Sequence, residues 1–217
     1  MDALIKHYPA IRSQTKTKIE ISMKKIYQLL ALSLMAIMFS SCGYNNMVDK
    51  REEVNKSWAN VQTQYQRRSD LIPKLAKVVK SYANFEQETL TKVIEARSKA
   101  TSVNISAENL TEENLAKFKA AQSEVSAGLG RLLAVVENYP DLKANQNYMD
   151  LQRELAGTEN RIAVARNNYN DAVKMYNAYI KKIPRVIYAG WFGFKEKPFY
   201  EADAGSEKAP TLEELDN

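Results

Sequence analysis

The chain of 217 residues has few of the side chains on which most enzymes and metal sites depend. It contains one histidine, His7, and one cysteine, Cys42. Nucleophilic enzymes commonly pair serine or cysteine with histidine, and common zinc sites combine histidine with cysteine. The sequence also lacks the G-x-S-x-G, G-x-G-x-x-G and phosphate-loop motifs. We therefore expect no enzymatic activity, no catalytic residue, no metal and no cofactor. Catalysis by carboxylates alone stays open, although no pair of acids suggests it.

The only cysteine ends a segment that has the pattern of a secretory signal. Residues 23–25 are Met-Lys-Lys, residues 26–39 form an apolar run, and residues 40–41 are serines. A basic region, an apolar region and small residues before the cut are the three parts of such a signal. The apolar run has about 14 residues, whereas a helix that spans a bilayer needs roughly 20. The segment therefore indicates a signal peptide better than a transmembrane helix.

Cys42 itself resembles the lipidated cysteine of a bacterial lipoprotein signal. Two small residues precede it and Gly43 follows it, although Phe39 stands where that pattern more often has leucine. We predict that residues 1–41 are a leader and that Cys42 is acylated, for example with palmitate, as the new N-terminus. The alternative is an ordinary signal peptide or a short anchor with an unmodified cysteine. Residues 1–22 do not fit a signal, and we interpret them as preceding the natural start; an unusually long basic leader is the alternative.

The leader accounts for most of the net charge. The whole chain has 31 basic and 26 acidic residues, and removal of residues 1–41 leaves 25 basic and 24 acidic residues. Binding of nucleic acid requires a basic patch or stripe. The mature chain shows no basic run of this kind, so we expect no nucleic-acid partner.

Residues 42–183 are poor in helix breakers and rich in helical periodicity. Proline is absent between Pro73 and Pro140, and apolar residues repeat every seven positions from about residue 44 to residue 100 and again from 148 to 183. We predict an all-α fold, an antiparallel bundle of three to four long helices. Pro73 predicts a kink or a restart of the first helix, with Ser69 or Asp70 capping the freed amides.

A second helix is predicted after a connection at residues 101–110. Thr111, followed by two glutamates, is a suitable first residue, and Pro140 marks the turn at the end. Gly128 and Gly130 weaken this helix by about 1 kcal/mol each relative to alanine. We expect close approach of a neighbouring helix to be the reason for them; a functional glycine is the alternative.

The character of the sequence changes after Pro184. Residues 184–202 place aromatic side chains among glycines and prolines, and this spacing does not predict a helix. Two interpretations are open: the aromatic residues fold back over one end of the bundle, or some stay exposed as a docking surface. The candidate partner surface consists of Tyr188, Trp191, Phe192 and Phe194. Residues 203–217 are acidic, small and polar, which predicts a disordered tail.

Three blocks of the mature chain resemble the LemA family of bacterial envelope proteins. They are residues 44–83 (YNNMVDKREEVNKSWANVQTQYQRRSDLIPKLAKVVKSYA), 142–177 (LKANQNYMDLQRELAGTENRIAVARNNYNDAVKMYN) and 183–201 (IPRVIYAGWFGFKEKPFYE). The resemblance implies a helical bundle, attachment to a membrane with the bundle outside the cytoplasm, and no assigned enzymatic activity. Members of the family typically carry a transmembrane anchor at the N-terminus, and here a lipoprotein signal replaces it.

Arg68 lies on the apolar stripe of the first helix, where a charge is costly unless it is paired. Glu159 lies beside the seam of the last helix. We predict a structural ion pair between Arg68 and Glu159 that fixes the register of the two helices; the alternative is that Arg68 reaches solvent. Three asparagines near the same seam are candidates for buried amide bonds, and two arginines are predicted to face solvent. The asparagines are Asn160, Asn170 and Asn177, and the arginines are Arg161 and Arg166.

Together these patterns predict a lipid-anchored, non-enzymatic interaction or scaffold module of the bacterial cell envelope. We expect it on the outer membrane facing the periplasm, with the membrane and an envelope protein as partners and with a homo-oligomer possible. Two other functions stay open. One is an accessory of an envelope protease or a carboxylate-based enzyme, and the other is a structural coiled-coil spacer.

Overall fold

The computed structural model describes the backbone of residues 8–81 and 86–201, and the side chains of residues 23–31, 43–81 and 86–201. The predictions for the side chain of Cys42 and for the tail at residues 203–217 lie outside the described residues. The chain divides into two compact units, residues 1–48 and residues 49–217. The helical bundle belongs to the second unit.

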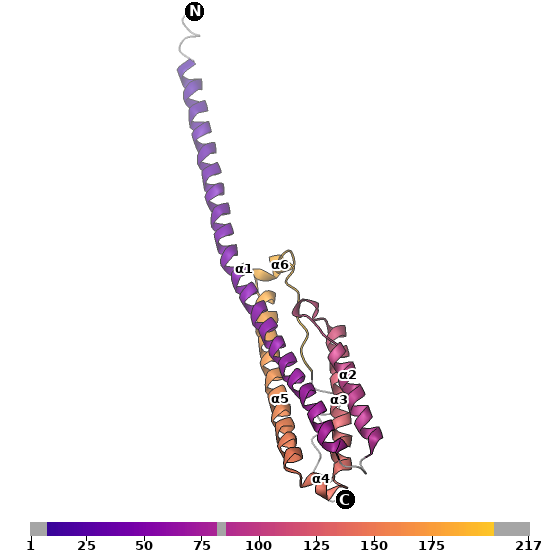
Figure 1. Cartoon of the computed structure of the whole chain (residues 1–217). Helices are drawn as coiled ribbons and strands as arrows, with labels where there is room; N and C mark the ends of the chain where they lie inside the picture. Colours follow the sequence, from indigo (N-terminus) through magenta and orange to yellow (C-terminus); the bar gives the residue numbers. More distant parts are fainter. Residues whose placement is uncertain (1–7, 82–85, 202–217) are drawn as a thin grey trace, which may run out of the picture. The chain divides into compact units, whose positions relative to one another are not determined.

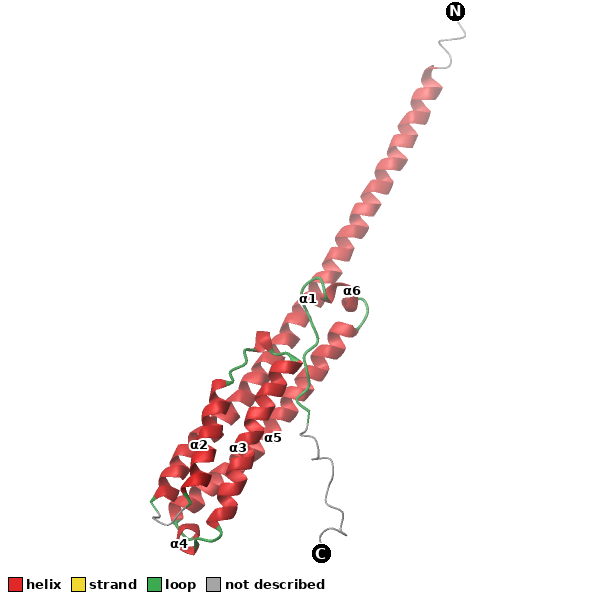
Figure 2. Cartoon of the chain, turned by 90° about the vertical axis from the view of Figure 1, so that its right-hand side faces the viewer, coloured by secondary structure: helices red, strands yellow, loops and turns green. Residues whose placement is uncertain are grey.

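The described part of the chain is helical and contains no strand, so the all-α prediction is confirmed (Figure 1, Figure 2). Among the described residues, no helix has a stretch both long and apolar enough to span a bilayer. In chain order the elements are α1 (Tyr8–Lys80), α2 (Gln87–Ser102), the 3-10 turn η1 (Ala107–Asn109), α3 (Glu112–Val136), α4 (Pro140–Lys143), α5 (Gln146–Lys181) and α6 (Arg185–Ala189).

Four of these helices form an antiparallel bundle: α1 from residue 49 onward, α2, α3 and α5 (Figure 2). Contacts between α1 and α5 pair early residues of one with late residues of the other, as Trp58 with Tyr169 and Arg68 with Glu159 show. Alternating directions follow from short connections, because a helix that turns back at once lies beside its predecessor. The prediction of three to four long antiparallel helices is confirmed.

The predicted restart at Pro73 is wrong. Helix α1 continues through Pro73 to Lys80, and α2 begins at Gln87. Proline lacks an N–H, so the carbonyl four residues earlier, that of Ser69, loses its helical partner. Arg97 of α2 supplies a replacement, since its Nε donates to the Ser69 carbonyl at 2.8 Å. A neighbouring helix therefore supplies the hydrogen bond that Pro73 removes, and of the two predicted outcomes, a kink or a restart, the restart does not occur.

Helices α2 and α3 pack closely against each other, and Gly128 explains how. A Cβ atom at Gly128 would lie 3.3 Å from Cγ2 of Val93 on α2, so an alanine would press on that side chain. At Gly130 a Cβ would meet nothing within 4 Å. Close approach of a neighbouring helix is thus the reason for Gly128 and does not explain Gly130. The predicted start of α3 is also confirmed, because the Thr111 hydroxyl accepts from the Asn114 amide.

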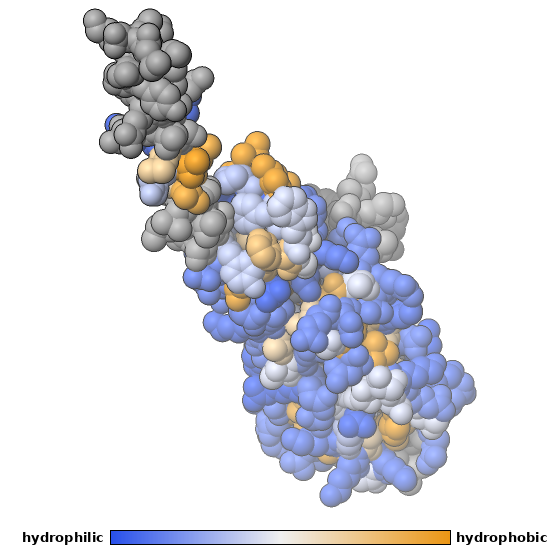
Figure 3. Space-filling model, turned by 90° about the horizontal axis from the view of Figure 1, so that it is seen from above, coloured by the Kyte–Doolittle hydropathy of each residue, from blue (hydrophilic) through white to orange (hydrophobic). Residues whose placement is uncertain are grey.

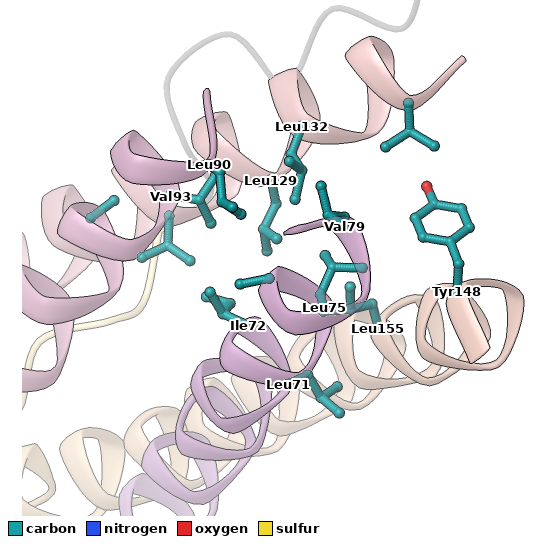
Figure 4. Packing of buried hydrophobic residues seen from close by; sticks show 14 of the residues in the cluster. Leu71, Ile72, Leu75, Val79, Leu90, Val93, Leu129, Leu132, Tyr148 and Leu155 are labelled. Atoms are coloured by element: carbon teal, nitrogen blue, oxygen red, sulfur yellow. The ribbon is translucent and has the colours of Figure 1, made fainter. Parts of the chain in front are cut away.

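An aliphatic core fills the half of the bundle where α1 ends and α5 begins (Figure 4). We call it the aliphatic half. Its buried members from the four helices and α4 are Leu71, Ile72, Leu75, Val79, Leu90, Val93, Leu129, Leu132, Leu142 and Leu155. Burying each such side chain stabilises the fold by about 1.5–3 kcal/mol before entropy is counted. This half supplies much of the hydrophobic stabilisation of the bundle.

Candidate functional site: the strap and the apolar cap

The other half of the bundle is built from aromatic rings. Trp58 lies 5.2 Å from the ring of Phe118 and 5.5 Å from that of Tyr169, and Tyr65 meets Phe118 edge to face at 5.1 Å. The Trp58 indole donates to the Ile105 carbonyl at 3.0 Å. Large rings hold α1, α3 and α5 together while their polar atoms reach towards the edge of the core. We call this region the aromatic half.

Arg68 separates the two halves. The sequence analysis predicted its pairing with Glu159, and Nη1 lies 2.9 Å from Glu159 Oε1. The same guanidinium donates to the Ser126 hydroxyl at 2.8 Å and to both the carbonyl and the side-chain oxygen of Gln122, at 3.0 and 2.8 Å. Arg68 is only 1% exposed while Glu159 is 49% exposed. A buried charge persists because neutral acceptors on α3 share it with the carboxylate.

The C-terminal segment at residues 195–201, which we call the strap, lies extended along α5. Two Tyr-Asn pairs of α5, seven residues apart, hold it. Tyr176 donates to the Lys195 carbonyl at 2.9 Å, and Asn177 both donates to the Lys197 carbonyl and accepts its amide, each at 2.9 Å. Each asparagine thus acts as a strand neighbour would, because its amide offers one donor and one acceptor.

The second pair repeats these contacts further along the strap. Tyr169 donates to the Pro198 carbonyl at 2.7 Å, and Asn170 holds the carbonyl and the amide of Tyr200 at 2.9 and 2.8 Å. Seven residues of a helix rise about 10.5 Å. Three extended residues cover about 10 Å. One heptad of α5 therefore matches three residues of the strap, which is why the same dipeptide binds twice.

The end of the strap is locked into the aromatic half. The hydroxyls of Tyr200 and Tyr65 lie 2.8 Å apart, and the guanidinium of Arg166 donates to Tyr65 while it stacks over the Tyr200 ring at 4.6 Å. The prediction that Arg166 faces solvent is wrong, because these two rings and a hydroxyl half-bury it. Asn170 and Asn177 make amide bonds to the strap, and Asn160 is exposed.

Burial changes the titration of the groups that hold the strap. It raises the pKa of Tyr169 and of Tyr176, so both hydroxyls keep the proton that they donate to strap carbonyls. It lowers the pKa of Lys197, and the nearby charge of Arg51 lowers it further, while Glu108 opposes this. The Lys197 ammonium donates to the Ala107 carbonyl at 2.8 Å and so ties the strap to η1.

Five large apolar side chains remain exposed where α5 ends and α6 follows. We call them the cap: Ile183, Val186, Ile187, Trp191 and Phe192. Ile183 is 82% exposed and Trp191 is 81% exposed, which leaves almost all of their surface in solvent. The segment nevertheless has a fixed inner side, because Ala189 and Phe194 are buried and the Phe194 amide donates to the Ala189 carbonyl at 3.0 Å.

The cap differs in part from the predicted partner surface. Trp191 and Phe192 are exposed as that surface requires, and Tyr188 is half-buried with its ring against that of Phe192. Phe194 is buried beneath the Arg51 guanidinium, so its place in an exposed surface is wrong. The expectation of no helix after Pro184 is also wrong, since α6 spans Arg185–Ala189.

Sequence reasoning missed the aliphatic members of the cap. Ile183 is the last position of the predicted heptad repeat, and its place on a buried seam is wrong because α5 ends at Lys181 and leaves it exposed. Val186 and Ile187 follow Pro184, beyond the repeat. Isoleucine and valine that continue beyond the last seam position have no predicted helix to pack against. That signal, together with the neighbouring aromatic residues, could have identified them as a surface.

Cations border the cap. Residues 181–195 contain Lys181, Lys182, Arg185 and Lys195 and no aspartate or glutamate. Lys181 pairs with Glu196 of the strap at 2.7 Å, and Arg185 stacks on the Tyr179 ring at 3.8 Å. Residues 42–217 contain 25 basic and 24 acidic residues, so this basic border is a local feature.

Two open hollows on the second unit are lined mainly by polar residues. The larger, about 1320 Å³, lies between the strap and the start of α3 and includes Glu108, Glu112 and Glu113. Hydrogen bonding to Lys117 lowers the pKa of Glu113, which is the opposite of what a general acid requires. Among the side chains that the structure describes, no three of His, Cys, Asp and Glu gather as a metal site would need.

Comparison with known proteins identifies relatives over most of the chain. The model of the LemA family matches residues 57–213. Magnetosome protein MamQ 2 of Paramagnetospirillum magneticum is 27% identical over 197 residues, a match that covers 81% of this chain and 72% of the relative. Protein LemA of Metamycoplasma hominis is 26% identical over 175 residues and is matched over 79% of this chain and 76% of its own length.

Proposed function

The chain belongs to the LemA family, and we propose that it is a lipid-anchored, non-catalytic module of the bacterial cell envelope that works by contact with a partner. The observation that carries this proposal is the cap. Soluble surfaces rarely expose contiguous large apolar groups, and where they do the patch usually marks an interaction site. Five such side chains lie together at one end of the bundle, on a segment whose inner side is packed and fixed.

The way in which the polar groups are used supports a role without chemistry. Arg68, Tyr169 and Lys197 are buried or half-buried groups of the kind that a catalytic site could use, and each is engaged in holding helices or the strap. The carboxyl groups of Glu88 and Glu113 have pKa values lowered by hydrogen bonds from neighbouring lysines. These contacts favour a rigid body that presents a surface.

The proposed attachment rests on the signal-like segment that ends at Cys42. Acylation of this cysteine would hold the protein on a membrane, because each buried methylene contributes about 0.8 kcal/mol and several chains add up. We propose the outer membrane, with the bundle facing the periplasm. Labelling with radioactive palmitate tests the anchor, and the variant Cys42→Ser should lose both the label and the membrane fraction.

In-cell photocrosslinking tests the contact function. The full-length chain carries a photoreactive residue at position 191 in the cap. A control carries it at position 164 of α5, where Val164 is also exposed but lies outside the cap. We expect adducts to a foreign molecule, protein or lipid, from position 191 and few from position 164. Adducts only between copies of the chain, or none, would refute the contact function and favour a structural spacer.

A further inference from the structure

We infer that the cap docks on an anionic lipid surface next to the anchor. This inference rests on the proposed function, because it names the partner of the same surface. It differs from the anchor itself: acylation of Cys42 would hold the chain on the membrane, whereas docking of the cap would fix the bundle's end against it.

The length of chain between Cys42 and the bundle limits how far the cap can be from the membrane. The bundle unit begins at residue 49, seven residues after the cysteine. Seven residues reach at most about 25 Å when fully extended. The cap lies at the end of the bundle where the chain enters, since Lys50 lies over the Tyr179 ring and Arg51 over that of Phe194. A lipidated Cys42 therefore keeps this end of the bundle near the bilayer.

The chemistry of the cap matches the interface of a bilayer. Tryptophan and phenylalanine accompany isoleucine and valine there, and aromatic side chains favour the headgroup level. The basic border of residues 181–195 has four cations, of which Lys181 pairs with Glu196 of the strap and the other three suit anionic headgroups. Long basic side chains can keep their charges among the lipid phosphates while the apolar side chains of the cap are buried in the bilayer. Figure 3 views this end and shows apolar surface, in orange, interrupting the hydrophilic surface.

The cap is formed before any partner binds. Phe194 and Ala189 pack inward. Arg185 donates to the backbone carbonyl of Tyr179 at 3.4 Å and stacks on the ring of the same tyrosine. The two Tyr-Asn pairs of α5 hold the strap, and the strap holds the C-terminal side of the cap. A fixed arrangement loses little conformational entropy on docking. This favours insertion of a few side chains over the folding of a new helix.

Quenching by brominated lipids tests the inference. The full-length lipidated protein is reconstituted into vesicles of phosphatidylcholine and phosphatidylglycerol with brominated acyl chains. The chain has two tryptophans, of which Trp58 is buried in the bundle. We expect loss of about half the emission in the wild type, because Trp191 is one of the two. The variant Trp191→Phe should show almost no quenching.

A displaced tryptophan is the matched control. The double variant Trp191→Phe/Val164→Trp keeps two tryptophans but places the exposed one on α5, about 26 Å along the helix from residue 181 at 1.5 Å per residue. We expect no quenching of this variant. Equal quenching of both positions, or none at either, would overturn the docking of the cap.

Further experiments test whether docking depends on charge and whether the partner is a lipid or a protein. The wild type and the variant Lys182→Glu are compared with both proteins lipidated at Cys42. The variant should show about fivefold or more weaker docking of the cap in anionic vesicles. It should have no such effect in vesicles of phosphatidylcholine alone. Palmitate on Cys42 without quenching of Trp191 would refute the lipid partner and leave the anchor intact. A single foreign protein crosslinked at position 191 would also refute lipid docking while supporting the contact function.

Discussion

The two halves of the bundle bury different chemistry. The aliphatic half packs leucine, isoleucine and valine from all four long helices into a continuous cluster. The aromatic half packs the rings of Trp58, Tyr65, Phe118 and Tyr169. Trp58 donates to the backbone of the loop before α3, Tyr169 donates to the backbone of the strap, and the hydroxyl of Tyr65 meets that of Tyr200 at the end of the strap. The aliphatic half stabilises the helices by burial alone. The aromatic half also holds the strap, which is not part of any helix.

The difference shows where specificity is placed in this fold. Aliphatic side chains can repack around each other at modest cost, so they bring the helices together without fixing one exact relative position. Hydrogen bonds from Asn170 and Asn177 are lost if the strap shifts by one residue, because the carbonyl and amide then leave the side-chain amide. The aromatic half therefore determines the position of the strap. Because the strap follows the cap in the chain, it also holds the C-terminal side of the cap.

The largest expected loss of stability comes from the aliphatic half. Leu75 is fully buried, and Leu75→Ala should lower the free energy of unfolding by about 2–5 kcal/mol through lost burial and a cavity. In the aromatic half, Tyr176→Phe removes only one hydroxyl and should cost about 1 kcal/mol. Chemical denaturation of both variants measures the contrast. An equal cost for the two would show that the halves do not differ as described.

The boundary between the halves should respond next most strongly. Arg68→Ala removes a buried guanidinium and leaves Gln122 and Ser126 acceptors unpaired, for an expected cost of about 3 kcal/mol. Glu159→Ala should cost about 1 kcal/mol, because half of that side chain is exposed and Arg68 keeps its other partners. If both variants melt at the wild-type temperature, the pair does not fix the helices.

Release of the strap is expected to cost less for each asparagine changed than the loss of Arg68. Asn170→Ala and Asn177→Ala each remove two hydrogen bonds to the strap, which corresponds to about 2 kcal/mol per asparagine. Asn160→Ala on the same helix is the control, since Asn160 is exposed and should change stability by less than about 0.5 kcal/mol. Limited proteolysis should cut the strap of Asn170→Ala/Asn177→Ala before that of Asn160→Ala or of the wild type. Equal cleavage of these three proteins would show that the two asparagines do not hold the strap.

A dependence on alkaline pH is the smallest expected effect. The pKa of Tyr169 and of Tyr176 is raised in the folded state, so the folded chain keeps protons that the unfolded chain loses above about pH 10. Their contribution to stability is present below that pH and is lost as the pH rises further. Denaturation between pH 8 and 11 should show a steeper loss for the wild type than for Tyr169→Phe. Parallel curves would contradict this assignment.

The repetitive parts of the fold follow from the sequence. The heptads of α5 up to Tyr176, the Thr111 start and the turn at Pro140 depend on contacts within a few residues, and the structure contains each of them. Arg68 could be paired with Glu159 because a charge on an apolar stripe demands a partner from the facing helix. These are cases in which local chemistry admits few solutions.

The remaining features depend on neighbours that the sequence does not place. Pro73 stays within a helix only because Arg97, from another helix, bonds the orphaned carbonyl. The aromatic segment after Pro184 divides into buried Phe194 and exposed Trp191 according to where the strap lies on α5. The repeated Tyr-Asn dipeptide is visible in the sequence, but its meaning requires the knowledge that an extended segment runs beside it.

The most direct test of the account asks whether the strap serves the cap. The yield of foreign adducts from a photoreactive residue at position 191 is measured in intact cells, in the wild type, in Asn170→Ala/Asn177→Ala, and in Val79→Ala as a variant of the aliphatic half. The double asparagine variant should lose the adducts while Val79→Ala, although less stable, should keep them. Equal yields from all three proteins would contradict the claim that the aromatic half holds the cap in place for its partner.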